Sequence, residues 1–365
     1  MTSPDFTTQM QDNMRTLLAE MVKLEASDLH LVPGYRPIFR LHGRLIPTTW
    51  DIVTPEDSIQ MIASVVPDAK AKQFSESTNL DFSVGIPSDV PDEQYRFRAN
   101  AFRADGNVCG CFRFIPKRVP TFEWMGFPQH IARSIVELTN GLVIVTGVTG
   151  SGKSTTLAAM VNMFNEGGGY RIITAEDPIE YRYERTDHTI ITQREVGVDC
   201  NSFYDGLKYG LRQDPDVILV GEIRDRDTAR MALSAAETGH LILTTMHTKD
   251  AKGAVSRFVD LFPHSAQDDI RVQLSYNLRF VIAQHLLPDV DPTRRRALAL
   301  ETMIVNNPVR AGIRLGKLEA IESAIQTGRA DGMIRLDDSL HGLVSTGRIS
   351  SETARRFAKH PEAFV

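Results

Sequence analysis

The sequence predicts an α/β protein in which a larger carboxyl-terminal domain, built on a mostly parallel sheet, follows a smaller α+β domain. From residue 140 onward, apolar β-branched runs alternate with helical patterns, which is typical of βαβ units. The first 118 residues instead combine one amphipathic helical segment with short stretches of alternating polar and apolar residues. A chain of 365 residues is long enough for two domains that each bury a core.

Composition and charge exclude several classes of protein. The 41 basic and 46 acidic residues give a net charge of −5, and neither half is a basic arm, so we expect no nucleic-acid partner. The apolar runs are far shorter than the roughly 20 residues that a membrane-spanning helix needs. The start, Met1–Phe6, lacks the basic and apolar stretches of a secretory signal. Three cysteines without a C-x-x-C pair fit a reducing compartment. These features predict a cytoplasmic protein.

Prolines mark the expected boundary between the domains. Pro116, Pro120 and Pro128 punctuate a connecting segment. We therefore assign residues 1–118 to the first domain, 119–139 to a linker and 140–365 to the second domain.

The elements of the second domain follow from its apolar runs. We expect strands over residues 142–146, 171–175, 217–220 and 241–245. We expect helices over residues 153–165, 203–212, 226–238 and 266–287, and several short helices after Pro288.

A phosphate-binding loop is the most specific signal. Residues Gly147 to Ser154 match G-x-x-x-x-G-K-[ST] between an apolar strand and a helical pattern, as this motif requires. The glycines let N–H groups converge on phosphate oxygens, while Lys153 neutralises phosphate charge and the Ser154 hydroxyl ligates Mg²⁺. The sequence therefore predicts that ATP and Mg²⁺ bind here. The expected nucleotide-binding residues are Gly147, Thr149, Gly150, Ser151, Gly152, Lys153, Ser154 and Thr155.

Carboxylates follow two of the expected strands. Glu176, Asp177 and Glu180 come at the end of the second strand, and Glu222 follows the third strand after Gly221. Because ligands of a parallel sheet bind at the carboxyl ends of its strands, these acids are expected at the same edge as the phosphate-binding loop. One acid of the first group can orient a water molecule for attack on the γ-phosphate, but spacing alone does not choose among the three. Glu222 stands in a Walker B arrangement and is expected to help hold Mg²⁺.

Two histidines flank the fourth strand. His247 follows this strand and is therefore expected at the same edge, in a sensing or catalytic role. His240 precedes the strand and lies at its opposite end. A satisfied surface or core histidine is the alternative interpretation of each.

These motifs together resemble one family, the ATPases of type II/IV secretion systems and type IV pili, and within it the retraction motors of twitching motility. The similarity extends from residues 26–31 to the C-terminal helices. Its four motifs are a Walker A at 147–154, an Asp box at 173–181, a Walker B at 220–225 and a His box at 238–248.

The resemblance implies a fold and a set of roles. It implies a PAS-like N-terminal domain, a RecA-like P-loop ATPase domain and a homohexamer that binds ATP between subunits. By the same resemblance, the functional residues are the catalytic Glu180, the Walker B acid Glu222, the His-box pair His240 and His247, and the arginine sensors Arg98 and Arg113.

The family also implies a motor at the cytoplasmic face of the inner membrane, where it drives pilus disassembly through a membrane platform protein. The segment 309–314 matches the essential C-terminal helix of retraction motors imperfectly, because Gly312 weakens it. Val148 and Asn140 also depart from the family pattern, although neither change removes a group that hydrolysis needs. A secretion or accessory pilus ATPase is therefore one alternative. A RecA-like nucleic-acid translocase and a nucleotide-binding regulator without turnover are two others.

Overall fold

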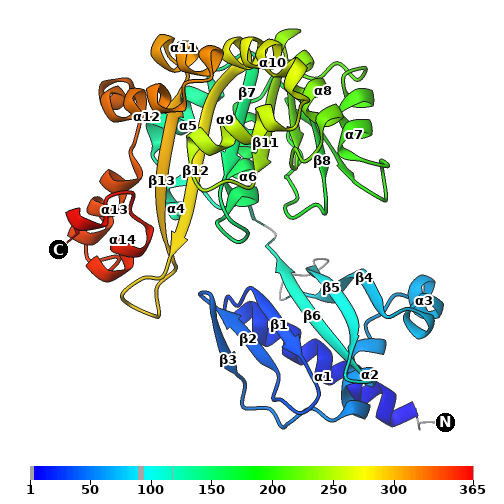
Figure 1. Ribbon diagram of the computed structural model, residues 1–365. Coiled ribbons are helices and arrows are strands. Elements are labelled where there is room, and N and C mark those ends of the chain that lie inside the picture. Colours follow the sequence, from blue (N-terminus) through cyan, green and yellow to red (C-terminus); the bar gives the residue numbers. More distant parts are fainter. Residues whose placement is uncertain (1–3, 89–93, 117, 365) are drawn as a thin grey trace. The chain divides into compact units, whose positions relative to one another are not determined.

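The computed structural model describes residues 4–88, 94–116 and 118–364, and these form two compact units that divide at residue 117 (Figure 1). Residues 1–3, on which the expectation of no secretory signal partly rests, lie outside the described residues. Over the described ranges, no helix has both the length and the apolar character needed to cross a membrane.

The smaller unit is built on an antiparallel sheet. In its described part, six strands pair in the order β3-β2-β1-β6-β5-β4, and the amphipathic segment near the amino terminus forms α1. The elements are α1 (Pro4–Lys23), β1 (Asp28–Leu31), β2 (Ile38–Leu41), β3 (Arg44–Pro47), α2 (Pro55–Ala63), α3 (Ala71–Glu76), β4 (Asn79–Pro87), β5 (Gln94–Ala104) and β6 (Asn107–Ile115).

Only one face of this sheet is apolar. Side chains alternate between the two faces of a strand, and β4 accordingly alternates exposed and buried positions along its whole length. Phe97 and Phe112 are fully buried in one cluster with Met14 and Leu17 of α1. Polar and charged side chains therefore occupy the other face, including Arg98 and Arg113.

The larger unit is built on a mostly parallel sheet. Among the described residues, seven strands pair in the order β13-β12-β7-β11-β10-β8-β9, and all neighbouring strands are parallel except β12 and β13. The strands are β7 (Gly141–Thr146), β8 (Arg171–Glu176), β9 (Ile190–Glu195), β10 (Val217–Val220), β11 (Leu241–Met246), β12 (Leu278–Leu287) and β13 (Ala297–Ile304).

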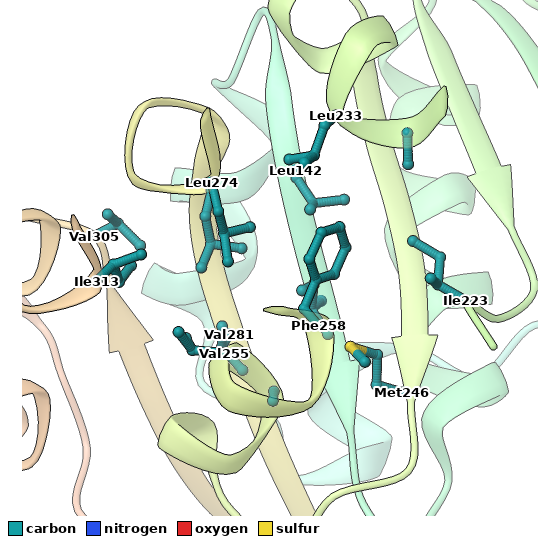
Figure 2. Packing of buried hydrophobic residues seen from close by; sticks show 14 of the residues in the cluster. Leu142, Ile223, Leu233, Met246, Val255, Phe258, Leu274, Val281, Val305 and Ile313 are labelled. Atoms are coloured by element: carbon teal, nitrogen blue, oxygen red, sulfur yellow. The ribbon is translucent and has the colours of Figure 1, made fainter. Parts of the chain in front are cut away.

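Helices cover both faces of this sheet. Leu142 of β7 packs with α8, α9 and α10, whereas its neighbour Val143 packs with α5 and α6 on the opposite face. Figure 2 shows Phe258 of α9 within the first of these clusters. The helices are α4 (Phe122–Met125), α5 (Gln129–Val136), α6 (Lys153–Gly167), α7 (Phe203–Gly210), α8 (Arg226–Glu237), α9 (Ala251–Asp260), α10 (His264–Asn277), α11 (Asn307–Leu315), α12 (Leu318–Thr327), α13 (Leu336–Ser345) and α14 (Ser351–Phe357).

The helix predicted over residues 266–287 is wrong in its second half. The helix α10 ends at Asn277, and the chain continues directly as β12, which pairs in parallel with β7. Nearly all of β12 is buried, and periodicity does not distinguish such a continuous apolar run from a buried helix. The strand β13 was likewise not predicted, since only short helices were expected after Pro288.

Residues 119–139 are not an extended linker. They contain α4 and α5, and the side chains of Phe122, Phe127 and Ile131 are buried in the cluster that covers one face of the larger sheet. The prolines mark helix starts as well as a boundary, because Pro128 immediately precedes α5.

We predict that Phe258→Ala destabilises the larger unit by about 3–5 kcal/mol, because truncation removes a fully buried ring and leaves a cavity. Calorimetry of the full chain should show a lower midpoint for the transition of the larger unit, with the smaller unit unaffected. Val198→Ala is the control, since Val198 is 74% exposed. Equal midpoints for Phe258→Ala and the unmodified protein would contradict the packing described.

Candidate active site

One edge of the larger sheet brings the predicted site residues together. The strands β7, β11, β10 and β8 are consecutive neighbours and parallel, so their carboxyl ends meet at this edge. The phosphate-binding loop follows β7, His247 follows β11, Glu222 follows β10, and Glu180 lies on the segment after β8. The site is therefore assembled from four separate crossings of the sheet.

The loop depends on glycine at defined positions. Gly147, Gly150 and Gly152 have φ angles of +150°, +78° and +89°, which L side chains rarely adopt. At Gly147, a Cβ atom would also lie 2.5 Å from the Gln284 carbonyl oxygen and from Ser151 Oγ. Glycine is therefore required at position 147 for two reasons: its backbone adopts the positive φ angle, and it has no Cβ atom to clash with Gln284 and Ser151.

Lys153 opens α6 and folds back over this loop. Its side chain is buried, and Nζ donates to the carbonyl oxygens of Gly147 (3.0 Å) and Val148 (3.2 Å). Burial lowers the pKa of Lys153, while the carboxylates of Glu222 and Glu180 raise it. The two loop carbonyls therefore hold the ammonium group in place, and both acids favour its charged form.

The other loop residues present polar groups around this lysine. Ser154, Thr149 and Gly150 are exposed, whereas Ser151 is buried. The Thr155 hydroxyl lies 2.9 Å from the Tyr181 hydroxyl, which ties the start of α6 to the segment after β8.

Two residues that support the loop were not predicted. Gln284 of β12 donates from Nε2 to the Ser151 carbonyl oxygen (2.7 Å), and Arg296 donates to the Gly150 carbonyl oxygen (3.2 Å). Gln284 lies in the run expected to be helical, and Arg296 ends a run of three arginines between β12 and β13. The long separation of these residues from the loop in sequence leaves no local signal for either contact.

Glu222 lies between two cationic or titratable side chains. Its carboxylate, 12% exposed, has Oε2 3.0 Å from His247 Nε2 and Oε1 2.5 Å from Arg224 Nε. The preceding Gly221 leaves room for Phe203, because a Cβ atom there would lie 2.9 Å from the Phe203 ring. This packing explains why a glycine separates the strand from the acid.

The three acids after β8 differ in their surroundings. The Glu176 carboxylate accepts hydrogen bonds from Thr174 Oγ1 (2.6 Å) and Gln193 Nε2 (3.1 Å), and burial raises its pKa. Asp177 is exposed. Glu180 is half-buried, and its charge acts on Lys153. Of these three acids, Glu180 is the one whose charge raises the pKa of Lys153.

His240 lies at the other edge of the sheet. It precedes β11, which spans six residues or roughly 20 Å, and so stands far from His247. Its Nδ1 lies 3.1 Å from the Ala235 carbonyl oxygen and 3.3 Å from Thr238 Oγ1. The role of His240 stays a prediction, and its ring contacts a local turn at the edge opposite His247.

The predicted arginine sensors lie on the polar face of the smaller unit. Arg98 of β5 and Arg113 of β6 are directly opposite each other across the two strands. Arg113 Nε lies 2.8 Å from an Asp28 carboxylate oxygen, and Asp28 is only 4% exposed. Asp28 therefore fixes one arginine of the pair, while Arg98 is exposed.

Ser154 and Glu222 fit a magnesium ion that arrives with its nucleotide. Within the described residues, no cluster of three or more His, Cys, Asp or Glu side chains could hold a metal by itself. Mg²⁺ usually keeps several waters and is held by one or two protein groups together with substrate phosphates. A hydroxyl beside the phosphate-binding loop and a nearby carboxylate are such a set.

Known proteins with similar sequences and structures share this architecture. Residues 7–338 match the family described as Type II/IV secretion system protein. The type IV pilus retraction ATPase PilT of Pseudomonas aeruginosa is 42% identical over 348 residues, which cover 95% of this chain and 98% of PilT.

Two solved structures are similar over almost the whole chain. The pilus retraction motor PilT with bound ADP has a TM-score of 0.82 at 38% identity and covers 96% of this chain and 98% of its own. The ATPase DotB of Legionella pneumophila has a TM-score of 0.83 at 26% identity, over 97% and 95% of the two chains. These similarities confirm the predicted fold class and the family inferred from the motifs. The chain therefore belongs to the Type II/IV secretion system protein family, and it matches a pilus retraction ATPase of that family over nearly its whole length.

Proposed function

We propose that this chain is a hexameric motor that hydrolyses ATP to power retraction of type IV pili, by driving pilus disassembly. The observation that carries this proposal is the convergence of the phosphate-binding loop, Glu180, Glu222 and His247 at one sheet edge. A relative that covers 95% of the chain is named as a pilus retraction ATPase, and its structural counterpart binds ADP.

Nucleotide binding uses the loop and the start of α6. The loop amides and Lys153 bind the phosphates, and Lys153 exchanges its two carbonyl partners for phosphate oxygens, which are stronger acceptors because they are charged. Ser154 and Glu222 organise the Mg²⁺ that accompanies the nucleotide. Gly147, Thr149, Gly150, Ser151, Gly152 and Thr155 complete the binding loop.

Hydrolysis requires a group that accepts a proton from water. Glu180 orients a water molecule in line with the γ-phosphorus and accepts its proton while the new P–O bond forms and the bond to ADP breaks. His247 contacts Glu222 and so senses the state of the Walker B acid. The resemblance to the family assigns this role to Glu180, and Glu176 is already engaged by Thr174 and Gln193.

Assembly completes the site. In the proposed homohexamer, Arg98 and Arg113 of one subunit stabilise charge on the phosphoryl group bound by its neighbour, as arginine fingers do. Rigid-body rotation between the two units of each subunit then transmits the work to an inner-membrane platform protein at the cytoplasmic face.

One observation favours a second candidate, a secretion or accessory pilus ATPase. Gly312 of α11 departs from the helix that retraction motors need, and a Cβ atom there would lie 2.9 Å from Ile321 of α12. This glycine therefore serves the packing of α11 on α12.

We predict that Lys153→Ala and Glu180→Gln separate binding from turnover. Lys153→Ala should lose both ATP binding and hydrolysis, whereas Glu180→Gln should bind ATP and reduce hydrolysis by at least about 100-fold, because it keeps the loop and removes only the base. Phosphate release and fluorescent-nucleotide binding measure the two steps. Glu184→Gln, an exposed acid on the same segment, is the control and should behave as wild type. Wild-type hydrolysis by Lys153→Ala would remove the ATPase assignment.

Arg98 should act on a neighbouring subunit. We expect Arg98→Ala and Lys153→Ala each to be inactive alone, but co-expressed subunits should regain hydrolysis, since mixed hexamers contain sites with both an intact loop and an intact arginine. The activity of the doubly tagged, co-purified oligomer measures this recovery. If the mixture stays as inactive as either variant, Arg98 does not act between subunits.

Deletion of the gene distinguishes the two candidate machines. Loss of a retraction motor should leave an excess of long surface pili, because extension continues without disassembly. Electron microscopy of deletion and parent cells counts them, and a strain complemented with Lys153→Ala should keep the excess. An unchanged count would assign the protein to secretion or an accessory role and leave its ATPase chemistry intact.

A further inference from the structure

The segment that carries His247 is anchored at three successive points. The Thr248 amide donates to Thr146 Oγ1 (2.8 Å), and His285 Nε2 lies 3.1 Å from the Lys249 carbonyl oxygen. The Ala251 amide, the first of α9, donates to Glu301 Oε1 (2.9 Å). The turn between β11 and α9 is therefore fixed to three strands: Thr248 to β7, Lys249 to β12 and Ala251 to β13.

Glu301 is an unusual anchor because it is a buried carboxylate. It lies on β13, is 2% exposed, and has Oε2 2.5 Å from Lys359 Nζ. A negative charge at a helix N-terminus is favourable, and the ammonium group of Lys359 offsets the cost of burying it.

Lys359 connects this anchor to the end of the chain. It follows α14, and its own amide donates to Asp337 Oδ1 of α13 (2.8 Å). Glu322 of α12 lies 3.8 Å from Lys359 and 2.5 Å from Lys252 of α9. The C-terminal helices thus meet the start of α9 through one network of charges.

The helix α9 does not need Glu301 in order to form. Asp250 is already its N-cap and accepts a hydrogen bond from the Gly253 amide at 2.7 Å. The bond from Ala251 to Glu301 therefore determines where the helix begins relative to β13 rather than whether it begins.

We propose that Glu301, held by Lys359, is a positioning residue that sets the place of His247 against Glu222. The inference rests on the proposed role of these two residues in ATP hydrolysis. Glu301 acts through the start of α9. Glu301 and Lys359 together fix the position of Ala251, and the short turn between His247 and Ala251 then determines where the His247 imidazole lies. The C-terminal segment of the chain is thereby coupled to the ATPase site.

A double-mutant cycle on the full-length protein tests this coupling. Glu301→Gln should lower kcat by about tenfold with little change in the KM for ATP, because a displaced catalytic group affects turnover more than binding. In a His247→Ala background, the same substitution should change kcat by less than about twofold, since its target is gone. A purely structural role would lower kcat by the same factor in both backgrounds.

Variants at Lys359 test the same coupling without a substitution at the buried Glu301. Lys359→Met should reproduce the loss in kcat, and Lys359→Arg should restore most of it. Arg356→Met is the matched control, because Arg356 is an exposed cation of the same segment that pairs with Glu352. Thermal unfolding of each variant shows that the proteins compared are folded.

The outcomes separate this inference from the proposed function. The coupling would be overturned if Glu301→Gln lowered kcat by the same factor in the wild-type and His247→Ala proteins, or if His247→Ala alone left kcat unchanged. In either case, an inactive Lys153→Ala would still support the ATPase assignment. Wild-type hydrolysis by Lys153→Ala would overturn both. The coupling is supported if Glu301→Gln lowers kcat more in the wild-type protein than in His247→Ala, and if Lys359→Met also lowers kcat.

Discussion

The parallel register of the central strands is the constraint on which the rest of the larger unit depends. Thr146 at the end of β7 is level with Met246 of β11, and Val220 of β10 is level with both Thr244 and Ala175 of the flanking strands. Because these ends lie within two residues of one another along the register, four loops emerge at one edge and their side chains meet. A slip of one residue in any strand would exchange the faces of its side chains and move its loop.

Thr146 makes this register specific. Its hydroxyl lies 3.1 Å from the Met246 carbonyl oxygen, 3.0 Å from the Thr248 carbonyl oxygen and 2.8 Å from the Thr248 hydroxyl, and it accepts the Thr248 amide. A fully buried hydroxyl needs such partners, since an unpaired polar group is costly inside a protein. The residue before the phosphate-binding loop is thus joined to the residue after His247.

The parts of the site that the sequence predicted have local signals. The loop from Gly147 to Ser154 is defined by spacing, and Glu222 by its place after a buried strand. The strands β7, β8, β10 and β11 were predicted because β-branched runs bounded by turns are distinctive.

The supports of the site have no such signal. Gln284 contacts Ser151 across 133 residues, and Glu301 contacts Ala251 across 50. These partners are defined by tertiary pairing of β12 and β13, which were expected to be helical. An apolar run buried on both sides reads equally well as either structure, so the error in β12 concealed the contact of Gln284, and the missed strand β13 concealed that of Glu301.

The smaller unit shows that two residues of the same type can have different surroundings. Arg98 and Arg113 are adjacent on one sheet face, and nothing in their sequence separates them. Asp28, on the next strand, is level with Arg113 and also lies 3.9 Å from Arg40. Its buried carboxylate holds Arg113 through the guanidinium Nε, although most of the Arg113 side chain is exposed, as Arg98 is.

The charges around Lys153 explain how the site can respond to a nucleotide. The lysine is bound to neutral carbonyl oxygens, and Glu222 is bound to Arg224 and His247. Lys153 and Glu222 each therefore have partners within the protein. Phosphate oxygens attract Lys153 more strongly than carbonyl oxygens do, and a metal ion competes with Arg224 and His247 for the Glu222 carboxylate. In the proposed mechanism, nucleotide binding would therefore exchange both sets of partners, and the loss of the contact between His247 and Glu222 would act on the turn before α9.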